Sequence, residues 1–152
     1  MSVGGWLFKS EPQVFSIDDL RARKTAVWDG VRNYTARNHL RDQVKVGAGV
    51  LFYHSSCPQP GVAGLARVSK AGFPDPSAFD RGHEYYDPKS DPGAPRWYSV
   101  EVAFERKAKE LLPLAWMREN APGLPIFRLN RLSVVPLTGA EWGLLVKAAG
   151  LK

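Results

Sequence analysis

Short apolar runs along the chain predict the strands of a small sheet. Residues 6–8 form one such run and Pro12 follows it closely, so we expect a buried strand that presents Lys9 and Ser10 at its end. Residues 50–53 are continuously apolar, which is typical of a central strand buried on both faces. Three further strands are predicted at residues 62–68, 97–105 and 132–135.

Helix signals lie between these runs. Ser16 and Thr138 each begin a capping box, in which the N-cap side chain and an acidic residue three positions later satisfy each other's backbone N–H groups. Asn33 can cap another helix, and Pro113 suits the first turn of a fourth. We find no internal repeat and no domain boundary. The mixed order of elements predicts one α+β domain over residues 1–152, around a small sheet that is antiparallel or barrel-like.

Composition and charge narrow the possible functions. No stretch approaches the roughly 18 consecutive apolar residues of a transmembrane helix. The first residues lack the segments of a secretory signal, so we expect an intracellular protein, cytoplasmic or, in a eukaryote, nuclear. The single cysteine, Cys57, excludes an internal disulfide and fits a reducing compartment. The net charge of +6 favours a polyanionic partner such as a nucleic acid.

Residues 28–40, with the sequence WDGVRNYTARNHL, carry the groups that a flat, polar and partly anionic ligand requires. Trp28 offers a stacking face beside a glycine turn. Hydrogen-bonding edges come from Asp29, Asn33 and Asn38, and positive charges for phosphates come from Arg32, Arg37 and Arg41. The alternative interpretation is a turn followed by a basic, solvated helix with one core tryptophan.

The tryptophans have different expected roles. Three of them have the spacing of core residues and are expected to pack, namely Trp6, Trp116 and Trp142. Trp28 and Trp97 are placed to line a pocket. Trp97 adjoins residues 70–96, a long Pro- and Gly-rich connection of the kind that is usually functional or mobile. In the alternating strand of residues 97–105, Trp97 falls on the face opposite the core.

Catalytic motifs are sparse. The chain contains neither a GxxxxGK phosphate loop nor a GxGxxG fingerprint, so nucleotide hydrolysis and dinucleotide redox chemistry lack their usual support. The predicted strands of residues 50–53 and 62–68 form a hairpin, and its loop contains His54 and Cys57. These two residues are three positions apart and could pair a base with a thiol. Two ligands do not make a zinc site, so no metal is expected. The alternative interpretation of this pair is a strand-end histidine and a small, half-buried cysteine.

Four motifs, in order along essentially the whole chain, closely resemble the EVE domain of the thymocyte nuclear protein family. They are WLFKSEP, WDGVRNYTARN, FYHSSCPQPGVAGLARV, and YYDPKS before PRWYSVEV. The resemblance implies a PUA-like fold, a small mixed β-barrel with flanking short helices, related to the YTH domains that read methylated adenine in RNA. It also implies a non-catalytic pocket without cofactor or metal, which accepts a modified cytosine or adenine in DNA or RNA.

The resemblance further implies which residues hold the base. Trp28 would be the aromatic wall, Asn33 would supply a polar edge, and Trp97 would cap the opening. Arg32 and Arg37 would contact the flanking phosphates. The remaining pocket residues would lie at two strand ends and are Lys9, Ser10, Tyr53, His54 and Ser55.

Two alternatives differ in class from a base reader. A nucleic-acid-processing or nucleoside-processing enzyme would use Cys57 and His54, and a protein-interaction adaptor would use the Pro-rich residues 87–95. For a base reader we expect a monomer, with a separate effector protein for any downstream effect. The resemblance leaves open which modification is read and whether the nucleic acid is DNA or RNA.

Overall fold

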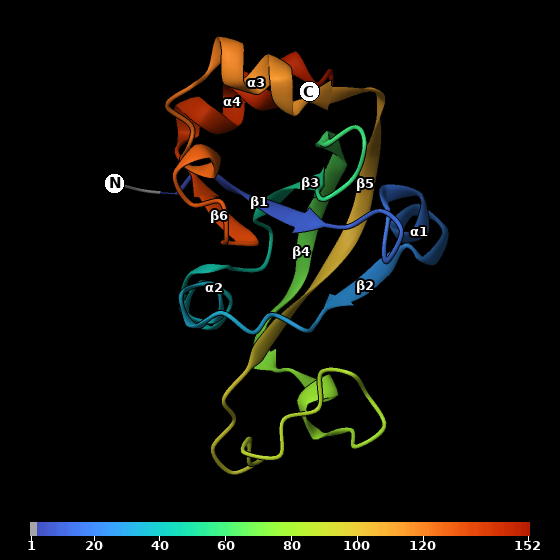
Figure 1. Ribbon diagram of the computed structural model, residues 1–152, viewed down its shortest axis with the longest axis vertical. Coiled ribbons are helices and arrows are strands. Elements are labelled where there is room, and N and C mark those ends of the chain that lie inside the picture. Colours follow the sequence, from blue (N-terminus) through green and yellow to red (C-terminus); the bar gives the residue numbers. More distant parts are fainter. Residues whose placement is uncertain (1–2) are drawn as a thin grey trace.

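A mixed sheet forms the centre of the protein in the computed structural model, which describes residues 3–152 (Figure 1). Within this range the sheet has six strands in the order β2-β5-β4-β3-β1-β6. The strands are β1 (Gly5–Ser10), β2 (Thr25–Trp28), β3 (Gly49–His54), β4 (Gly61–Pro74), β5 (Tyr98–Pro113) and β6 (Val134–Leu137). β1 and β3 are parallel, whereas the other neighbouring strands are antiparallel. The predicted domain, residues 1–152, includes Met1 and Ser2, which lie outside the described residues.

Short helices flank the sheet. They are α1 (Ile17–Arg23), α2 (Tyr34–Asn38) with the π-turn η1 (His39–Gln43), the 3-10 turns η2 (Pro76–Phe79) and η3 (Pro125–Phe127), α3 (Leu114–Asn120) and α4 (Gly139–Ala148). Both predicted capping boxes are present, at Ser16 and Thr138. α3 and α4 lie together at one end of the molecule, and the loop between β4 and β5 projects from the other end (Figure 1).

The middle of the sheet is fixed by its apolar strands. Leu51 and Phe52 of β3 are completely buried, as expected for a strand with neighbours on both sides. β4 bends at Gly64, where its pairing with β5 shifts register. A Cβ atom at Gly64 would lie 2.6 Å from the Ile17 side chain and 2.7 Å from the Arg106 carbonyl oxygen. Glycine therefore allows α1 to pack closely against this part of the sheet.

The predicted α+β class, with a small mixed sheet and short flanking helices, is confirmed. The sheet is not a closed barrel, because each of the two terminal strands, β2 and β6, pairs with one neighbour only within the described residues. No helix among residues 3–152 is long and apolar enough to cross a membrane.

Several strands differ from the prediction. β4 continues to Pro74, beyond its predicted end at residue 68 and into the predicted long connection of residues 70–96. β2 was not expected, because four residues with the sequence TAVW are too short to show a period. β5 continues to Pro113 through a run of charged side chains at residues 105–110, where Ala108 is the one buried residue and the sheet is solvated. β6 begins at Val134 rather than at Leu132, which is buried outside the strand.

Candidate nucleic-acid interface

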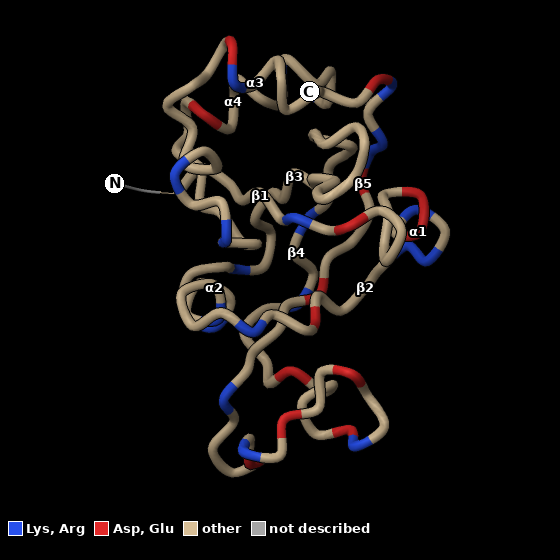
Figure 2. The backbone as a smooth tube through the Cα atoms, viewed as in Figure 1, with Lys and Arg blue, Asp and Glu red and all other residues tan. Residues whose placement is uncertain are grey.

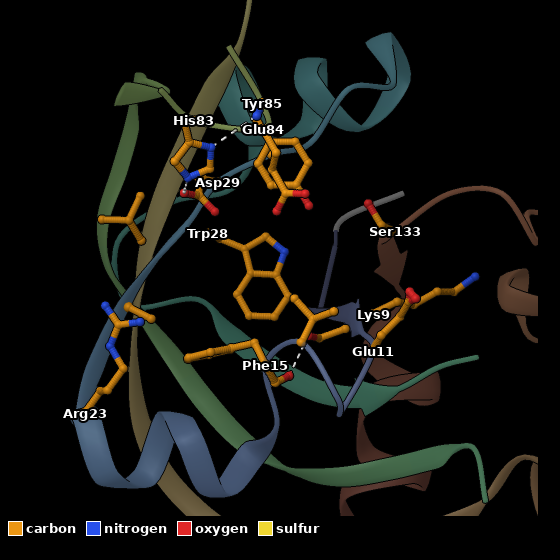
Figure 3. Close-up of a pocket in the computed structure, with 15 residues that line it drawn as sticks. Lys9, Glu11, Phe15, Arg23, Trp28, Asp29, His83, Glu84, Tyr85 and Ser133 are labelled. Carbon is orange, nitrogen blue, oxygen red and sulfur yellow. Dashed lines mark hydrogen bonds and ion pairs between the residues drawn. The ribbon is translucent and has the colours of Figure 1, made fainter. Parts of the chain in front are cut away.

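A cavity of about 470 Å³ lies beside the ends of β1 and β2 (Figure 3). Its walls come from three parts of the chain: the end of β1 with the turn that follows it, β2 with its glycine turn, and the loop between β4 and β5. The lining residues are Lys9, Ser10, Glu11, Val14, Phe15, Arg23, Ala26, Val27, Trp28, Asp29, Gly30, His83, Glu84, Tyr85 and Ser133. Residues distant in sequence therefore meet at one concave site.

Trp28 stands at the centre of this site (Figure 3). Its side chain alternates inward with that of Ala26 along β2, and Trp28 is only 8% exposed. The indole packs against three aromatic rings, with centroid distances of 5.3 Å to Phe8, 6.4 Å to Phe15 and 5.4 Å to Phe52. Support from behind holds the ring in one orientation, so it can present a fixed edge or face to a flat ligand.

The end of β1 supplies a polar rim. The Ser10 hydroxyl donates to the Phe15 carbonyl oxygen at 2.6 Å, and the Ser10 carbonyl oxygen accepts from the Ser55 N–H at 2.9 Å. Lys9 Nζ donates to the Asn130 carbonyl oxygen at 3.3 Å, and burial lowers the pKa of Lys9. This rim is held in place because β1 pairs with β3 on one side and β6 on the other.

The loop between β4 and β5 forms the opposite wall. Gly30 has a φ of +76°, and a Cβ atom there would overlap the Tyr85 ring, so the missing side chain makes room for that ring. The Tyr85 N–H donates to His83 Nδ1 at 3.1 Å. The neutral ring therefore carries its proton on Nε2, which lies 3.9 Å from Asp29 Oδ2.

A buried carboxylate, Asp75, connects this loop to the glycine turn. It accepts hydrogen bonds from the Gly30 N–H and from Arg32 Nη1, both at 2.9 Å, and from the N–H and hydroxyl of Ser77. Arg32 Nη2 donates to the Tyr85 carbonyl oxygen at 2.5 Å. Burial alone would raise the pKa of Asp75, but the hydrogen bonds from Ser77, Arg32 and Gly30 outweigh burial and lower it. We call Asp75, Gly30, Arg32, Ser77 and Tyr85 the Asp75 anchor.

Asp29 differs from Asp75 because no other residue among those described donates a hydrogen bond to its carboxylate. The Asp29 side chain is 38% exposed at the cavity. Burial raises the pKa of Asp29 and the negative charge of Asp75 adds to this effect, while His83, the backbone N–H of Asp29 itself and Arg32 oppose it. An acceptor that is partly desolvated and unpaired is well suited to receive a donor from a ligand.

Four residues that the sequence suggested for binding lie around the glycine turn but do not line the cavity. Arg32 belongs to the Asp75 anchor, and the Asn33 side chain caps α2 by accepting from the Ala36 N–H. Arg37 Nη1 donates to the Arg96 carbonyl oxygen at 2.6 Å. Trp97 is 7% exposed, so it does not lie on an outward face as predicted. Its Nε1–H donates to Asp87 at 2.7 Å and its ring stacks on Tyr34 at 4.9 Å, which encloses it.

The end of β3 is also outside the cavity lining. Tyr53 is 3% exposed, and burial raises its pKa to about 12. His54 Nε2 accepts from the Ile17 N–H at 3.1 Å, and burial lowers the pKa of His54. Ser55 reaches the site only through its backbone hydrogen bond to Ser10. Cys57 is half-buried and free, and no cluster of three or more His, Cys, Asp or Glu side chains suits a metal ion in residues 3–152.

Of the predicted base-holding residues, the structure thus brings Lys9, Ser10 and Trp28 together at the cavity. Sequence patterns did not predict the loop residues that face them, namely His83, Glu84 and Tyr85, nor Glu11, Arg23 and Ser133. The Pro- and Gly-rich sequence of this loop indicated only a long connection that is functional or mobile. Its position depends on Asp75, which lies 45 positions from Gly30 in the chain.

Comparisons with known proteins give one consistent result. The model of the EVE domain family matches residues 5–148. Thymocyte nuclear protein 1 of Homo sapiens is 42% identical over 158 aligned residues, which cover 90% of this chain and 70% of that protein. A hypothetical protein from Leishmania major has a TM-score of 0.92 at 41% identity, over 98% of this chain and 96% of the other. Human THYN1 protein in complex with 5-methylcytosine-containing DNA has a TM-score of 0.88 at 40% identity, over 95% and 96% of the two chains.

Proposed function

Because the chain belongs to the EVE domain family, we propose that it is a nucleic-acid-binding module that holds one modified base in the cavity beside Trp28. The observation that carries this proposal is the combination, in one cavity, of a rigid indole with polar side chains that keep free hydrogen-bonding capacity for a ligand. Proteins that read single bases use this combination, because the aromatic ring stacks on any base and the polar groups select among bases.

The dimensions of the cavity agree with this function. Its volume of about 470 Å³ falls within the range of about 300–1,000 Å³ that is usual for small-molecule sites. A base in a duplex must leave its stack to enter, at a cost of a few kcal/mol. Stacking on an aromatic side chain returns about 1–3 kcal/mol per base, so the edge contacts must supply the remainder.

The structural relative bound to DNA suggests the first ligand to test. Human THYN1, 40% identical, has been captured with 5-methylcytosine-containing DNA. We therefore propose 5-methylcytosine in DNA as the base that this chain binds, ahead of a modified adenine or an RNA ligand. We also propose that the whole chain acts as one domain and as a monomer, and that any downstream effect needs a separate protein.

Charge suggests where the nucleic-acid backbone runs. Residues 75–91 contain five acidic and two basic side chains, so the excess positive charge lies on the rest of the molecule (Figure 2). We propose that the phosphates contact arginines of α2 and of the cavity wall and avoid the acidic loop. Arg37 stays a proposed phosphate contact. Arg32 is already engaged in the Asp75 anchor, and Arg23, at the cavity, is the better second candidate.

The contacts of the hairpin loop fit a protein that binds without catalysis better than they fit an enzyme that uses His54 and Cys57. A general base must keep an accepting nitrogen available for the proton that it takes. His54 Nε2 already accepts from the Ile17 N–H. We therefore propose that His54 and Cys57 hold the start of α1 and the end of β3 rather than process a substrate.

The test is a binding titration with labelled short DNA duplexes that differ at one central cytosine: plain, 5-methyl or 5-hydroxymethyl. Fluorescence anisotropy should show tighter binding to one modified duplex, and tryptophan emission should be quenched in the same concentration range. Quenching should be lost in Trp28→Phe and kept in the matched control Trp116→Phe, because Trp116 lies in α3, outside the cavity lining. Equal, salt-sensitive binding to all duplexes would overturn the proposal, because it would show attraction by the basic surface alone.

A further inference from the structure

Two carboxylates of the cavity, those of Asp29 and Glu84, lie on one side of Trp28. Figure 3 shows them there beside His83, with Lys9 and Glu11 on the other side of the indole. No other residue among residues 3–152 donates a hydrogen bond to the Asp29 carboxylate, and His83 Nε2 lies 3.9 Å from Asp29 Oδ2. This side of the cavity therefore offers negative charge and free lone pairs to a ligand.

Ser10 adds to this preference for a donor. Its hydroxyl hydrogen is directed to the Phe15 carbonyl oxygen at 2.6 Å, so the lone pairs of Ser10 Oγ are what remains for a ligand. Glu11 also lines the cavity and is an acceptor when ionised. A ligand that carries an N–H donor can satisfy such groups, whereas a ligand with a carbonyl oxygen at the same place leaves them unpaired.

On the opposite side of the indole, Lys9 supplies hydrogen-bond donors. Its ammonium group lies at the rim with one hydrogen bond, to the Asn130 carbonyl oxygen at 3.3 Å, so two of its three donors are left for a ligand. A flat ligand that spans the cavity thus meets an acceptor near Asp29 and a donor near Lys9. The two sides together define a direction for the hydrogen-bonding edge of the ligand.

Pyrimidine bases differ in which hydrogen-bonding groups they carry at the two ends of the pairing edge. Cytosine carries an amino group at position 4 and a carbonyl oxygen at position 2, so it has a donor at one end of its pairing edge and an acceptor at the other. Thymine carries carbonyl oxygens at both ends. It also has the same 5-methyl group as 5-methylcytosine, from which it is produced by deamination. The 5-methyl group alone therefore cannot distinguish the two bases.

From this arrangement we infer that Asp29 selects bases with an exocyclic amino group, so that the cavity accepts 5-methylcytosine and rejects thymine. The inference rests on the proposed function and adds a specificity-determining residue to it. Asp29 accepts a hydrogen bond from the 4-amino group while Lys9 donates to the 2-oxo group. With thymine in the same position, the 4-oxo group faces the Asp29 carboxylate, and both lose their hydrogen bond.

The test uses four bases that combine two features, an amino or oxo group at position 4 and hydrogen or methyl at position 5: cytosine, 5-methylcytosine, uracil and thymine. Each is placed opposite an abasic site in the same duplex, so that differences in base pairing do not contribute. The wild-type protein should bind 5-methylcytosine about 10- to 100-fold more tightly than thymine. Asp29→Asn should reduce this ratio to about 1, because an amide can donate to the 4-oxo group.

A second variant tests whether the effect is particular to Asp29. Glu119→Gln changes an exposed carboxylate of α3, outside the cavity lining, and should leave the ratio as in the wild type. Thermal unfolding should show that Asp29→Asn is folded, because burial disfavours the charge that it removes. The preference for methyl over hydrogen at position 5 should persist in Asp29→Asn.

The outcomes separate the two proposals. If the wild-type protein binds all four bases equally, the proposed function fails. If it prefers 5-methylcytosine over cytosine but binds thymine equally well, base reading stands and the inference about Asp29 is overturned. An unchanged ratio of 5-methylcytosine to thymine affinity in Asp29→Asn also overturns it.

Discussion

The Trp28 cavity and the hairpin loop after His54 both contain groups with potential chemistry, and they differ in whether those groups already have partners. In the cavity, no other residue among those described donates a hydrogen bond to the Asp29 carboxylate. In the hairpin, the accepting nitrogen of His54 receives the N–H that begins α1, and the Ser55 N–H is bonded to Ser10. Hydrogen-bonding capacity that the fold leaves free indicates function better than residue type does.

The same comparison applies within a single stretch. Trp28 and Asp29 face the cavity, but Arg32 and Asn33, a few positions later, make contacts that build the molecule. Charge near a site does not by itself mean contact with a ligand, because a guanidinium can instead hold a loop. The following substitutions test whether residues of the cavity control base binding and whether the supporting residues control stability. They are given from the largest expected effect to the smallest.

Trp28→Ala should abolish selective binding of the modified base. It removes the stacking surface and leaves a void among Phe8, Phe15 and Phe52, at a cost of about 3–5 kcal/mol in the free energy of unfolding. Trp28→Phe keeps an apolar ring and serves as a folded second variant, in which affinity should drop but selectivity should persist. Binding is measured by anisotropy and folding by urea denaturation. Wild-type affinity in Trp28→Ala would place the base elsewhere.

Asp75→Asn should destabilise the protein by about 3 kcal/mol, because Arg32 loses its buried partner. The lowered pKa of Asp75 stabilises the fold above the ordinary aspartate pKa of about 3.9, and this contribution is lost as the pH falls through the lower folded value. The stability gap between variant and wild type should therefore be constant near neutrality and shrink in acid. A gap that does not change with pH would show that the charge of Asp75 is unimportant.

His54→Gln should change only the pH dependence of stability. The pKa of His54 is lowered by burial, so the unfolded chain takes up a proton before the native protein does, and stability falls as the pH drops below about 6.5. Glutamine can still accept from the Ile17 N–H but does not titrate, so this part of the dependence should disappear. The expected difference in the free energy of unfolding between His54→Gln and the wild type is about 1 kcal/mol or less.

Base selectivity at neutral pH should be unchanged in His54→Gln, and Cys57→Ser should alter neither binding nor stability by more than about 0.5 kcal/mol. Denaturation curves at several pH values, together with anisotropy, check both variants. A loss of base selectivity in either one would contradict the division between the cavity and the hairpin.

Local signals in the sequence were sufficient for much of the fold. The capping boxes at Ser16 and Thr138 and the apolar run of residues 50–53 depend on interactions over a few positions, and each appears as expected. The strand of residues 25–28 was missed, because it is too short to show a period and it forms only through pairing with β5.

The site was predictable only in part, because some of its residues are positioned by contacts between distant parts of the chain. Lys9, Ser10 and Trp28 lie at ends of apolar runs, which is a local property of the sequence. The opposite wall depends on a buried carboxylate at position 75 that reaches Gly30, and no short-range pattern records such a contact. Resemblance to a family supplied residue roles for Arg32 and Trp97, but the geometry gives both of them hydrogen bonds within the protein.

The pairing of β2 has a consequence for the order in which the protein is assembled. Trp28 lies opposite Val100, so the strand that carries the indole has no partner until β5 has been synthesised. Contacts over such separations form slowly, since a long segment must be closed before they stabilise anything. A nascent chain that ends before β5 would thus expose its aromatic residues and bind no base. The cavity is expected to form late in folding, although most of its lining residues lie within the first 30 positions.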